Sequence, residues 1–108
     1  MSDPTLETLL AARELVSVPE RWTQGDYARN YIGVGENSTS PDAVCWCGYG
    51  AIIKVSQAGG AGAASRYLDL AAPDNDWCGF QDNTTHAVML AAFDRAIAAR
   101  RRDLERTS

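Results

Sequence analysis

The sequence predicts a mainly α-helical protein, of the α or α+β class, with three to four helices packed around one core. Three observations lead to this prediction. Apolar residues recur at helical spacing in several stretches, and most of these stretches follow residues typical of a helix start. A small segment around residues 26–36 has turn residues and a period of two, which indicates an irregular or two-stranded structure. Hydrophobic residues make up 45% of the chain, enough to form a core.

The first helix is expected to begin with Asp3 as N-cap and Pro4 at the first helical position, where the missing N–H of proline costs nothing. Pro19 limits its length, so the helix should end at about residue 16 or 17. The apolar positions at helical spacing are Leu6, Leu9, Leu10, Ala12 or Arg13, and Val16.

The segment between residues 19 and 38 lacks helical periodicity. A helical turn is expected at residues 20–22, before the turn residues at 25 and 26. Residues 27–32 then alternate with a period of two, and Gly33 and Gly35 follow them. This pattern predicts a short strand or a hairpin.

A second helix is expected to start at Ser40-Pro41-Asp42, which resembles a cap and a first turn. Gly48 and Gly50 lower the helix propensity by about 1 kcal/mol each relative to alanine. We therefore expect another part of the chain to pack closely against them. The face that points to the core would carry Val44, Cys47, Ala51 and Val55.

The second half of the sequence predicts a glycine-rich connector over residues 58–64, a short helix over 64–71 that Pro73 ends, and an acidic loop over 74–83. The last helix is expected to open at residues 84–86 and to run past residue 100. The whole chain, 1–108, should form a single domain, with 100–108 as a basic tail that can fray. The apolar stripe of the last helix would be Val88, Leu90 or Ala91, Ala92, Phe93 and Ile97.

Several short motifs occur in an order and spacing that resemble a bacterial and phage family of small proteins known only as a domain of unknown function. The resemblance covers most of the chain and implies no activity. Where the family pattern has Trp-Asn-Asp before the last helix, this chain has Phe80-Gln81-Asp82, which leaves the role of an amide there open. The matching residues are Trp22-Thr23-Gln24-Gly25, Ala28-Arg29, Asp42-Ala43-Val44, Trp46-Cys47, Gly50-Ala51, Thr85, Val88, Leu90, Phe93-Asp94 and Ala96-Ile97.

Four residues are of the types that bind zinc: Cys45, Cys47, Cys78 and His86. Their number fits a tetrahedral site, but their spacing does not. Cys-x-Cys within a helix directs its side chains roughly 200° apart, and the chain has no Cys-x-x-Cys pair. We therefore expect neither a metal nor another cofactor.

A thiol-dependent enzyme is an alternative hypothesis, with Cys47 as nucleophile, His86 as base and Asp82 as the group that orients the base. The opposing interpretation is that Cys47 and Cys78 are small buried residues beside tryptophans. Buried, inert cysteine is the commoner case, so we expect no catalytic site.

A second alternative is a small-ligand binder, in which Gln24, Arg29 and Asp82 form a polar pocket beside Trp22 and Trp46. The same side chains could instead hold the irregular segment 19–35 against the helices, because buried polar groups need such partners. We favour the structural interpretation.

The charge distribution is uneven. Residues 1–94 carry twelve acidic against five basic residues, whereas residues 95–108 carry five arginines against two acidic residues. An acidic body makes nucleic-acid binding unlikely, since phosphate contacts need clustered Lys and Arg. An acidic surface that could dock onto another protein is formed by Asp74, Asp76, Asp82 and Asp94.

These observations favour a small non-catalytic protein-interaction module, a regulator or inhibitor, that binds another protein through its acidic surface. No stretch of about 18 apolar residues is present that would predict a membrane span. The amino terminus also lacks the basic and then apolar pattern of a secretory signal. We therefore expect a cytoplasmic protein without membrane contact.

Overall fold

The computed structural model describes residues 3–56 and 61–106, and it confirms a mainly α-helical fold with one small two-stranded sheet. No helix in these two stretches is long and apolar enough to span a membrane. The elements, with η for a single 3-10 turn, are α1 (Pro4–Leu15), η1 (Pro19–Arg21), β1 (Ala28–Arg29), β2 (Cys45–Trp46), α2 (Gly48–Val55), α3 (Ala61–Ala71), η2 (Pro73–Asn75), α4 (Trp77–Gln81) and α5 (His86–Arg106).

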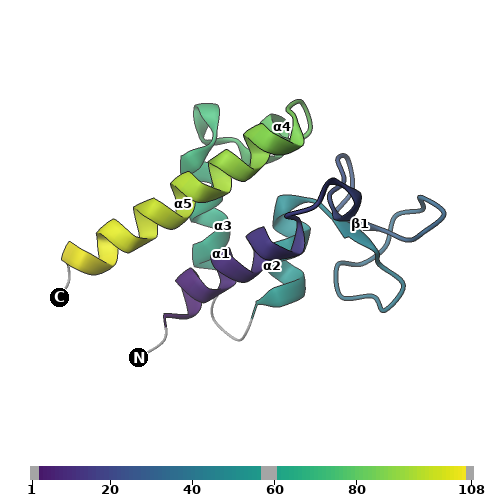
Figure 1. Ribbon diagram of the computed structural model, residues 1–108, viewed down its shortest axis with the longest axis horizontal. Coiled ribbons are helices and arrows are strands. Elements are labelled where there is room, and N and C mark those ends of the chain that lie inside the picture. Colours follow the sequence, from purple (N-terminus) through teal and green to yellow (C-terminus); the bar gives the residue numbers. More distant parts are fainter. Residues whose placement is uncertain (1–2, 57–60, 107–108) are drawn as a thin grey trace.

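The core lies between α1, α2, α3 and α5, and α2 packs against both α1 and α3. Figure 1 shows the long helix α5 extending along this group, and the loop-rich segment with β1 at the opposite end from the carboxyl terminus. The apolar side chains at the centre of the core have no exposed surface. They include Leu9, Ile52, Leu68, Met89 and Phe93.

The first helix begins and ends where the sequence predicts. The carboxylate of Asp3 accepts a hydrogen bond from Leu6 N at 2.8 Å, so it is an N-cap. Val16 caps the other end, and its N–H donates to the carbonyl of Ala12. Arg100 of α5 binds the same Asp3 carboxylate at 2.6 Å and ties the start of the first helix to the last one.

The predicted strand is present but short, and its partner was not foreseen. Residues of β1 pair in antiparallel register with those of β2, Ala28 with Trp46 and Arg29 with Cys45. The sequence placed β2 inside the second helix, and this prediction was wrong. The N–H of Val44 donates to the carbonyl of Arg29 at 2.9 Å. Backbone pairing across to β1 therefore replaces the first turns of the expected helix, and α2 begins only at Gly48.

The expectation of close packing at two glycines of α2 is confirmed. A Cβ atom at Gly48 would collide with the indole ring of Trp77, and one at Gly50 would collide with the backbone carbonyl of Tyr27. The first contact brings α2 against α4, and the second brings it against the segment before β1. Glycine lowers the helix propensity at these two positions, but it allows two close contacts that a residue with a side chain would prevent.

The second half of the chain is more helical than predicted. Helix α3 already begins at Ala61, inside the expected connector, of which residues 58–60 lie outside the described residues. The expected acidic loop contains η2 and α4, because the carboxylate of Asp76 caps α4 by accepting from Gly79 N at 3.1 Å. In α5, the predicted apolar stripe is wrong at Val88, which is 45% exposed. Met89, the next residue, is buried instead. Helix α5 continues to Arg106.

Candidate functional site

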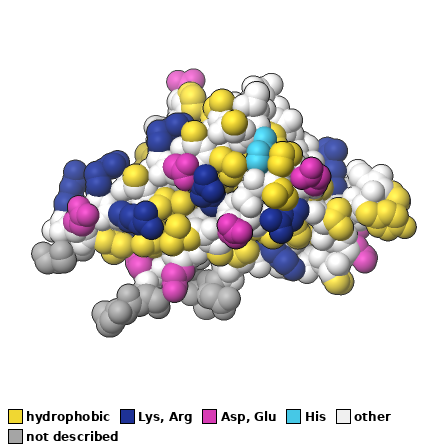
Figure 2. Space-filling model, viewed as in Figure 1, with side chains coloured by type: hydrophobic (Ala, Val, Ile, Leu, Met, Phe, Trp, Pro, Cys, Tyr) yellow, Lys and Arg dark blue, Asp and Glu magenta, His cyan; other side chains and the backbone are white. Residues whose placement is uncertain are grey.

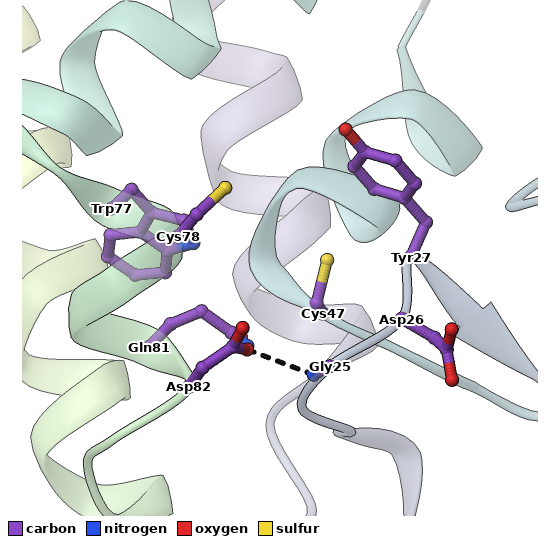
Figure 3. Close-up of a pocket in the computed structure, with 8 residues that line it drawn as sticks. All are labelled: Gly25, Asp26, Tyr27, Cys47, Trp77, Cys78, Gln81 and Asp82. Atoms are coloured by element: carbon purple, nitrogen blue, oxygen red, sulfur yellow. Dashed lines mark hydrogen bonds between the residues drawn. The ribbon is translucent and has the colours of Figure 1, made fainter.

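A cavity of about 290 Å³ lies between three parts of the chain that are distant in sequence. Residues 25–27 form one side, Cys47 lies at the start of α2, and the third side comes from Trp77, Cys78, Gln81 and Asp82 in and after α4. Figure 3 shows the side chains of Cys47 and Cys78 directed into the space between Tyr27 and Trp77. Such a size is at the lower end of small-molecule pockets, which measure about 300–1,000 Å³.

Gln81 holds the three sides of the cavity together, and only 2% of this residue is exposed. Its amide oxygen accepts hydrogen bonds from the indole N–H of Trp22 at 2.8 Å and from Gly48 N at 3.3 Å. Its amide nitrogen donates to Asp82, the next residue. One amide therefore fixes the irregular segment, the start of α2 and the end of α4 relative to one another.

Asp82 and Gly25 close the cavity on the side of the irregular segment. The Oδ1 atom of Asp82 accepts a hydrogen bond from Gly25 N at 3.0 Å, the dashed line in Figure 3. Gly25 has a backbone φ of +87°, which side chains with a Cβ rarely adopt. The approach of this backbone N–H to the carboxylate therefore depends on glycine at this position.

The two thiols in the cavity are not activated nucleophiles. Burial raises the pKa of Cys47 to about 11, against the stabilisation that the N–H of Gly50 provides. Burial, and next the negative charge of Asp82, also raise the pKa of Cys78. An attacking thiol needs the opposite environment, one that favours the thiolate at neutral pH.

The structure does not assemble the Cys47–His86–Asp82 arrangement of the thiol-enzyme hypothesis. His86 lies outside the cavity, where its Nε2–H donates to the carbonyl of Val16 at 2.7 Å and its ring lies 5.7 Å from that of Trp22. Asp82 hydrogen-bonds to Gly25 and Gln81 instead of to His86. The histidine joins the end of α1 to the start of α5 and has no thiol to deprotonate.

The four zinc-ligand candidates are likewise not brought together. Within residues 3–56 and 61–106, no group of three or more His, Cys, Asp or Glu side chains has the geometry to hold a metal ion. Cys47 and Cys78 share the cavity, but the thiol of Cys45 contacts the carbonyl of Arg29 at 3.9 Å in the sheet. His86 is bound to Val16, as described above.

Of the polar residues of the predicted pocket, Asp82 lines this cavity, whereas Gln24 and Arg29 do not and instead hold the irregular segment in place. Gln24 donates to the carbonyl of Gln81 at 2.7 Å and to that of Thr84 at 3.1 Å. Arg29 pairs with Asp26 at 2.8 Å and not with Asp82. The indole N–H of Trp46 donates to the carbonyl of Ser38 at 2.9 Å. These contacts, with that of Trp22 to Gln81, are the ones that the structural interpretation requires.

The four carboxylates of the predicted acidic surface differ in their surroundings. Asp76 caps α4, Asp82 binds Gly25, and Asp94 forms an ion pair with Arg13 at 2.6 Å. Asp74 has a backbone φ of +57° and lies on the surface. Three of the four thus also stabilise the fold.

Sequence reasoning did not identify Gln81, Tyr27 or Trp77 as residues of the site. A signal was present for Gln81, because the resemblance described in the sequence analysis had left the role of an amide at this position open. No local pattern marks Tyr27 or Trp77, because each reaches the site through its close approach to α2, Trp77 at Gly48 and Tyr27 at Gly50. A second unforeseen feature is the exposed loop over residues 30–34, which carries Tyr31, Ile32 and Val34.

Comparison with known families gives one match. A family model described as "Family of unknown function (DUF6197)" matches residues 1–99, which include every residue of the cavity and of the exposed loop. No curated protein and no solved structure matches the chain.

Proposed function

The chain belongs to the family of unknown function DUF6197, and from that premise we propose that the protein is a small, non-catalytic protein-interaction module. The observation that carries the proposal is an ordered loop, residues 30–34, that keeps apolar side chains in solvent. Tyr31 is 86% exposed, Ile32 68% and Val34 53%. Figure 2 has hydrophobic side chains on the surface at the end of the molecule where Figure 1 draws this loop-rich segment.

Asn30 fixes the shape of this loop. Its side-chain oxygen accepts from Ile32 N at 3.1 Å and from Val34 N at 3.0 Å, and its amide nitrogen donates to Glu36 at 3.0 Å. The backbone of Asn30 also bonds to that of Val34 at 2.9 Å and to Gly33 N at 2.9 Å. An ordered loop loses little conformational entropy when it binds. Less of the free energy gained from its apolar contacts is therefore lost, and the affinity is higher.

The exposed apolar side chains are concentrated in this part of the molecule. Of the ten large hydrophobic side chains exposed among the described residues, five lie between residues 27 and 44. Burying a side chain of this kind in a partner contributes about 1.5–3 kcal/mol. Single exposed apolar residues are ordinary, whereas a cluster of them indicates an interaction site.

The partner that fits this surface is another protein with a concave apolar pocket. A turn of five residues that projects its side chains needs a cleft to bury them, and a flat surface would contact only the tip. Docking through the acidic surface of Asp74, Asp76 and Asp82 stays a prediction. It is a weaker one, because two of these carboxylates are hydrogen-bonded within the fold.

The test compares Ile32→Asp with Leu70→Asp, which places the same charge at a 60% exposed apolar residue of α3. Tagged wild type and both variants are used to isolate proteins from a lysate of the source organism. We expect one partner to be retained by the wild type and by Leu70→Asp, and at least tenfold less of it with Ile32→Asp. Melting temperatures of the three proteins show whether each is folded.

Three results would contradict the proposal. One is that no protein is retained by the wild type above a tagged control. Another is that Ile32→Asp retains the same partner as well as Leu70→Asp does. The third is that size-exclusion chromatography finds a dimer that Ile32→Asp abolishes, because the loop would then bind a second copy of this chain.

A further inference from the structure

The cavity between Tyr27, Cys47 and α4 has features of a ligand site that the interaction loop does not use. It is about 290 Å³ in volume and lies away from residues 30–34. Two of its eight lining residues, Asp26 and Asp82, are acidic, and none is basic. Its field therefore disfavours an anion and favours a positively charged group.

Asp82 is the carboxylate of the cavity that has no cationic partner among the described residues. Asp26 is paired with Arg29 at 2.8 Å. Asp82 instead receives its hydrogen bonds at Oδ1, from the neutral donors Gly25 and Gln81. No donor within 3–56 or 61–106 bonds to its second oxygen. In Figure 3 the carboxylate of Asp82 lies at the edge of the open space.

Trp77 supplies the second, independent observation. Its side chain is fully buried, and its indole N–H has no hydrogen-bond partner among the residues that the structure describes. An unpaired buried donor of this kind destabilises the fold, and a ligand acceptor would remove that cost. The nitrogen edge of the ring packs against Gly48, and Figure 3 shows it on the side of the ring that faces Cys47 and the cavity.

We propose that this cavity binds a small organic amine that also carries a hydroxyl or carbonyl oxygen. The protonated amine pairs with Asp82, and the oxygen accepts the hydrogen bond of the Trp77 N–H. The body of the molecule lies between Tyr27 and the thiols. Trp77 lines the cavity but has no exposed surface in the free protein, so the side chains around it have to shift for the oxygen to reach the indole.

The experiment uses tyramine as the probe and the chain of residues 1–108 labelled with ¹⁵N at tryptophan. The signal of the Trp77 indole is assigned through the contact of this ring with the ring of Phe93. The centroids of the two rings lie 5.4 Å apart. We expect tyramine to shift this signal in a saturable manner. Two matched compounds should fail: 4-hydroxyphenylacetate, which replaces the amine by a carboxylate, and phenethylamine, which lacks the oxygen and should leave the Trp77 signal in place.

Two variants locate the binding of tyramine. Asp82→Asn keeps the Oδ1 acceptor and removes the charge, so the affinity should fall at least tenfold. Asp74→Asn is the matched control, because it removes a surface carboxylate that does not line this cavity, and it should bind as the wild type does. Cys78→Phe fills the cavity from an exposed position and should abolish binding even if Asp82→Asn does not fold.

The proposal is overturned if tyramine leaves the Trp77 signal unshifted. It is also overturned if 4-hydroxyphenylacetate shifts the signal equally, or if folded Asp82→Asn or Cys78→Phe binds tyramine like the wild type. None of these results depends on the loop at residues 30–34, so the outcome is independent of the proposed interaction function.

Discussion

The helical part of the molecule, α1 with α3 and α5, differs from the segment between residues 19 and 47 in what stabilises it. The helices contact one another through apolar side chains such as Leu9, Leu68 and Phe93, which have no exposed surface. The segment 19–47 contributes few such side chains, and its sheet has only two residues in each strand. Single polar side chains, Gln81 and Asn30 above all, fix its position.

This difference indicates which kinds of substitution should lower the free energy of unfolding in each region. In the helical part, the free energy of unfolding depends mainly on packed volume, and the ion pairs are exposed or only partly buried. In the segment 19–47 it depends on individual hydrogen bonds, such as the partly buried bond of Trp22 to Gln81 and the buried bond of Trp46 to Ser38. The following predictions compare the two regions, beginning with the largest expected effect.

Phe93→Ala should lower the free energy of unfolding by about 3–5 kcal/mol, because it leaves a cavity beside Trp77 in the helical core. Urea denaturation of the variant and the wild type measures this difference. Val88→Ala on the same helix is the control, since Val88 is on the surface, and it should cost much less. An effect of Phe93→Ala no larger than that of Val88→Ala would contradict the packing argument.

Gln81→Leu should cost about 2–3 kcal/mol, because it keeps the volume but leaves the N–H groups of Trp22 and Gly48 without an acceptor. The same denaturation experiment applies. Gln24→Leu is the matched control, and it should cost about 1 kcal/mol because it removes one donor from two carbonyl oxygens and leaves no N–H group without an acceptor. Equal effects of the two substitutions would mean that Gln81 has no special role at the junction of the two regions.

The thiol of Cys47 should make stability depend on alkaline pH. Its pKa is raised from 9.0 to about 11 in the folded protein, because burial disfavours the thiolate. The contribution of the protonated Cys47 thiol to the free energy of unfolding is therefore complete below pH 9. It is lost as the pH rises to 11, because this thiol loses its proton at a lower pH in the unfolded chain than in the folded protein. Wild type should lose on the order of 2 kcal/mol more than Cys47→Ala over this interval. Parallel pH profiles for the two proteins would contradict this assignment.

Asp94→Asn should have the smallest effect, at most about 1 kcal/mol, because the ion pair with Arg13 lies at the surface of the helical part. Thermal unfolding at low and at 1 M salt provides the measurement, and the difference from the wild type should vanish at high salt. A salt-independent loss of 2 kcal/mol or more would show that polar contacts matter in the helical region as well.

The same division explains what the sequence could predict. Helix α1 was predicted at both ends, because its cap and its apolar spacing are encoded locally. The start of α2 was predicted wrongly, because residues 41–47 depend on pairing with β1, which is distant in sequence. Gly48 and Gly50 indicated close packing correctly but could not identify Trp77 and Tyr27 as the groups that pack against them.

The candidate site was less predictable for the same reason. Cys47 and Asp82 were recognised as residues of interest, and both line the cavity, but the histidine assigned to them lies elsewhere. Asn30 and the exposed loop gave no signal, because Tyr31, Ile32 and Val34 fit an alternating strand as well as a turn. Periodicity reports which residues are apolar, and only the tertiary structure determines which of them remain uncovered.

The hydrogen bonds of Gln81 also have a consequence for the order of events during protein synthesis. The bond between Trp22 and Gln81 joins residues 59 positions apart. A sheet with two residues in each strand is too small to be stable by itself. The segment 19–47 therefore takes its final position only once α4 is present to bind Trp22, whereas the loop that carries Tyr31 can be shaped earlier by the local hydrogen bonds of Asn30.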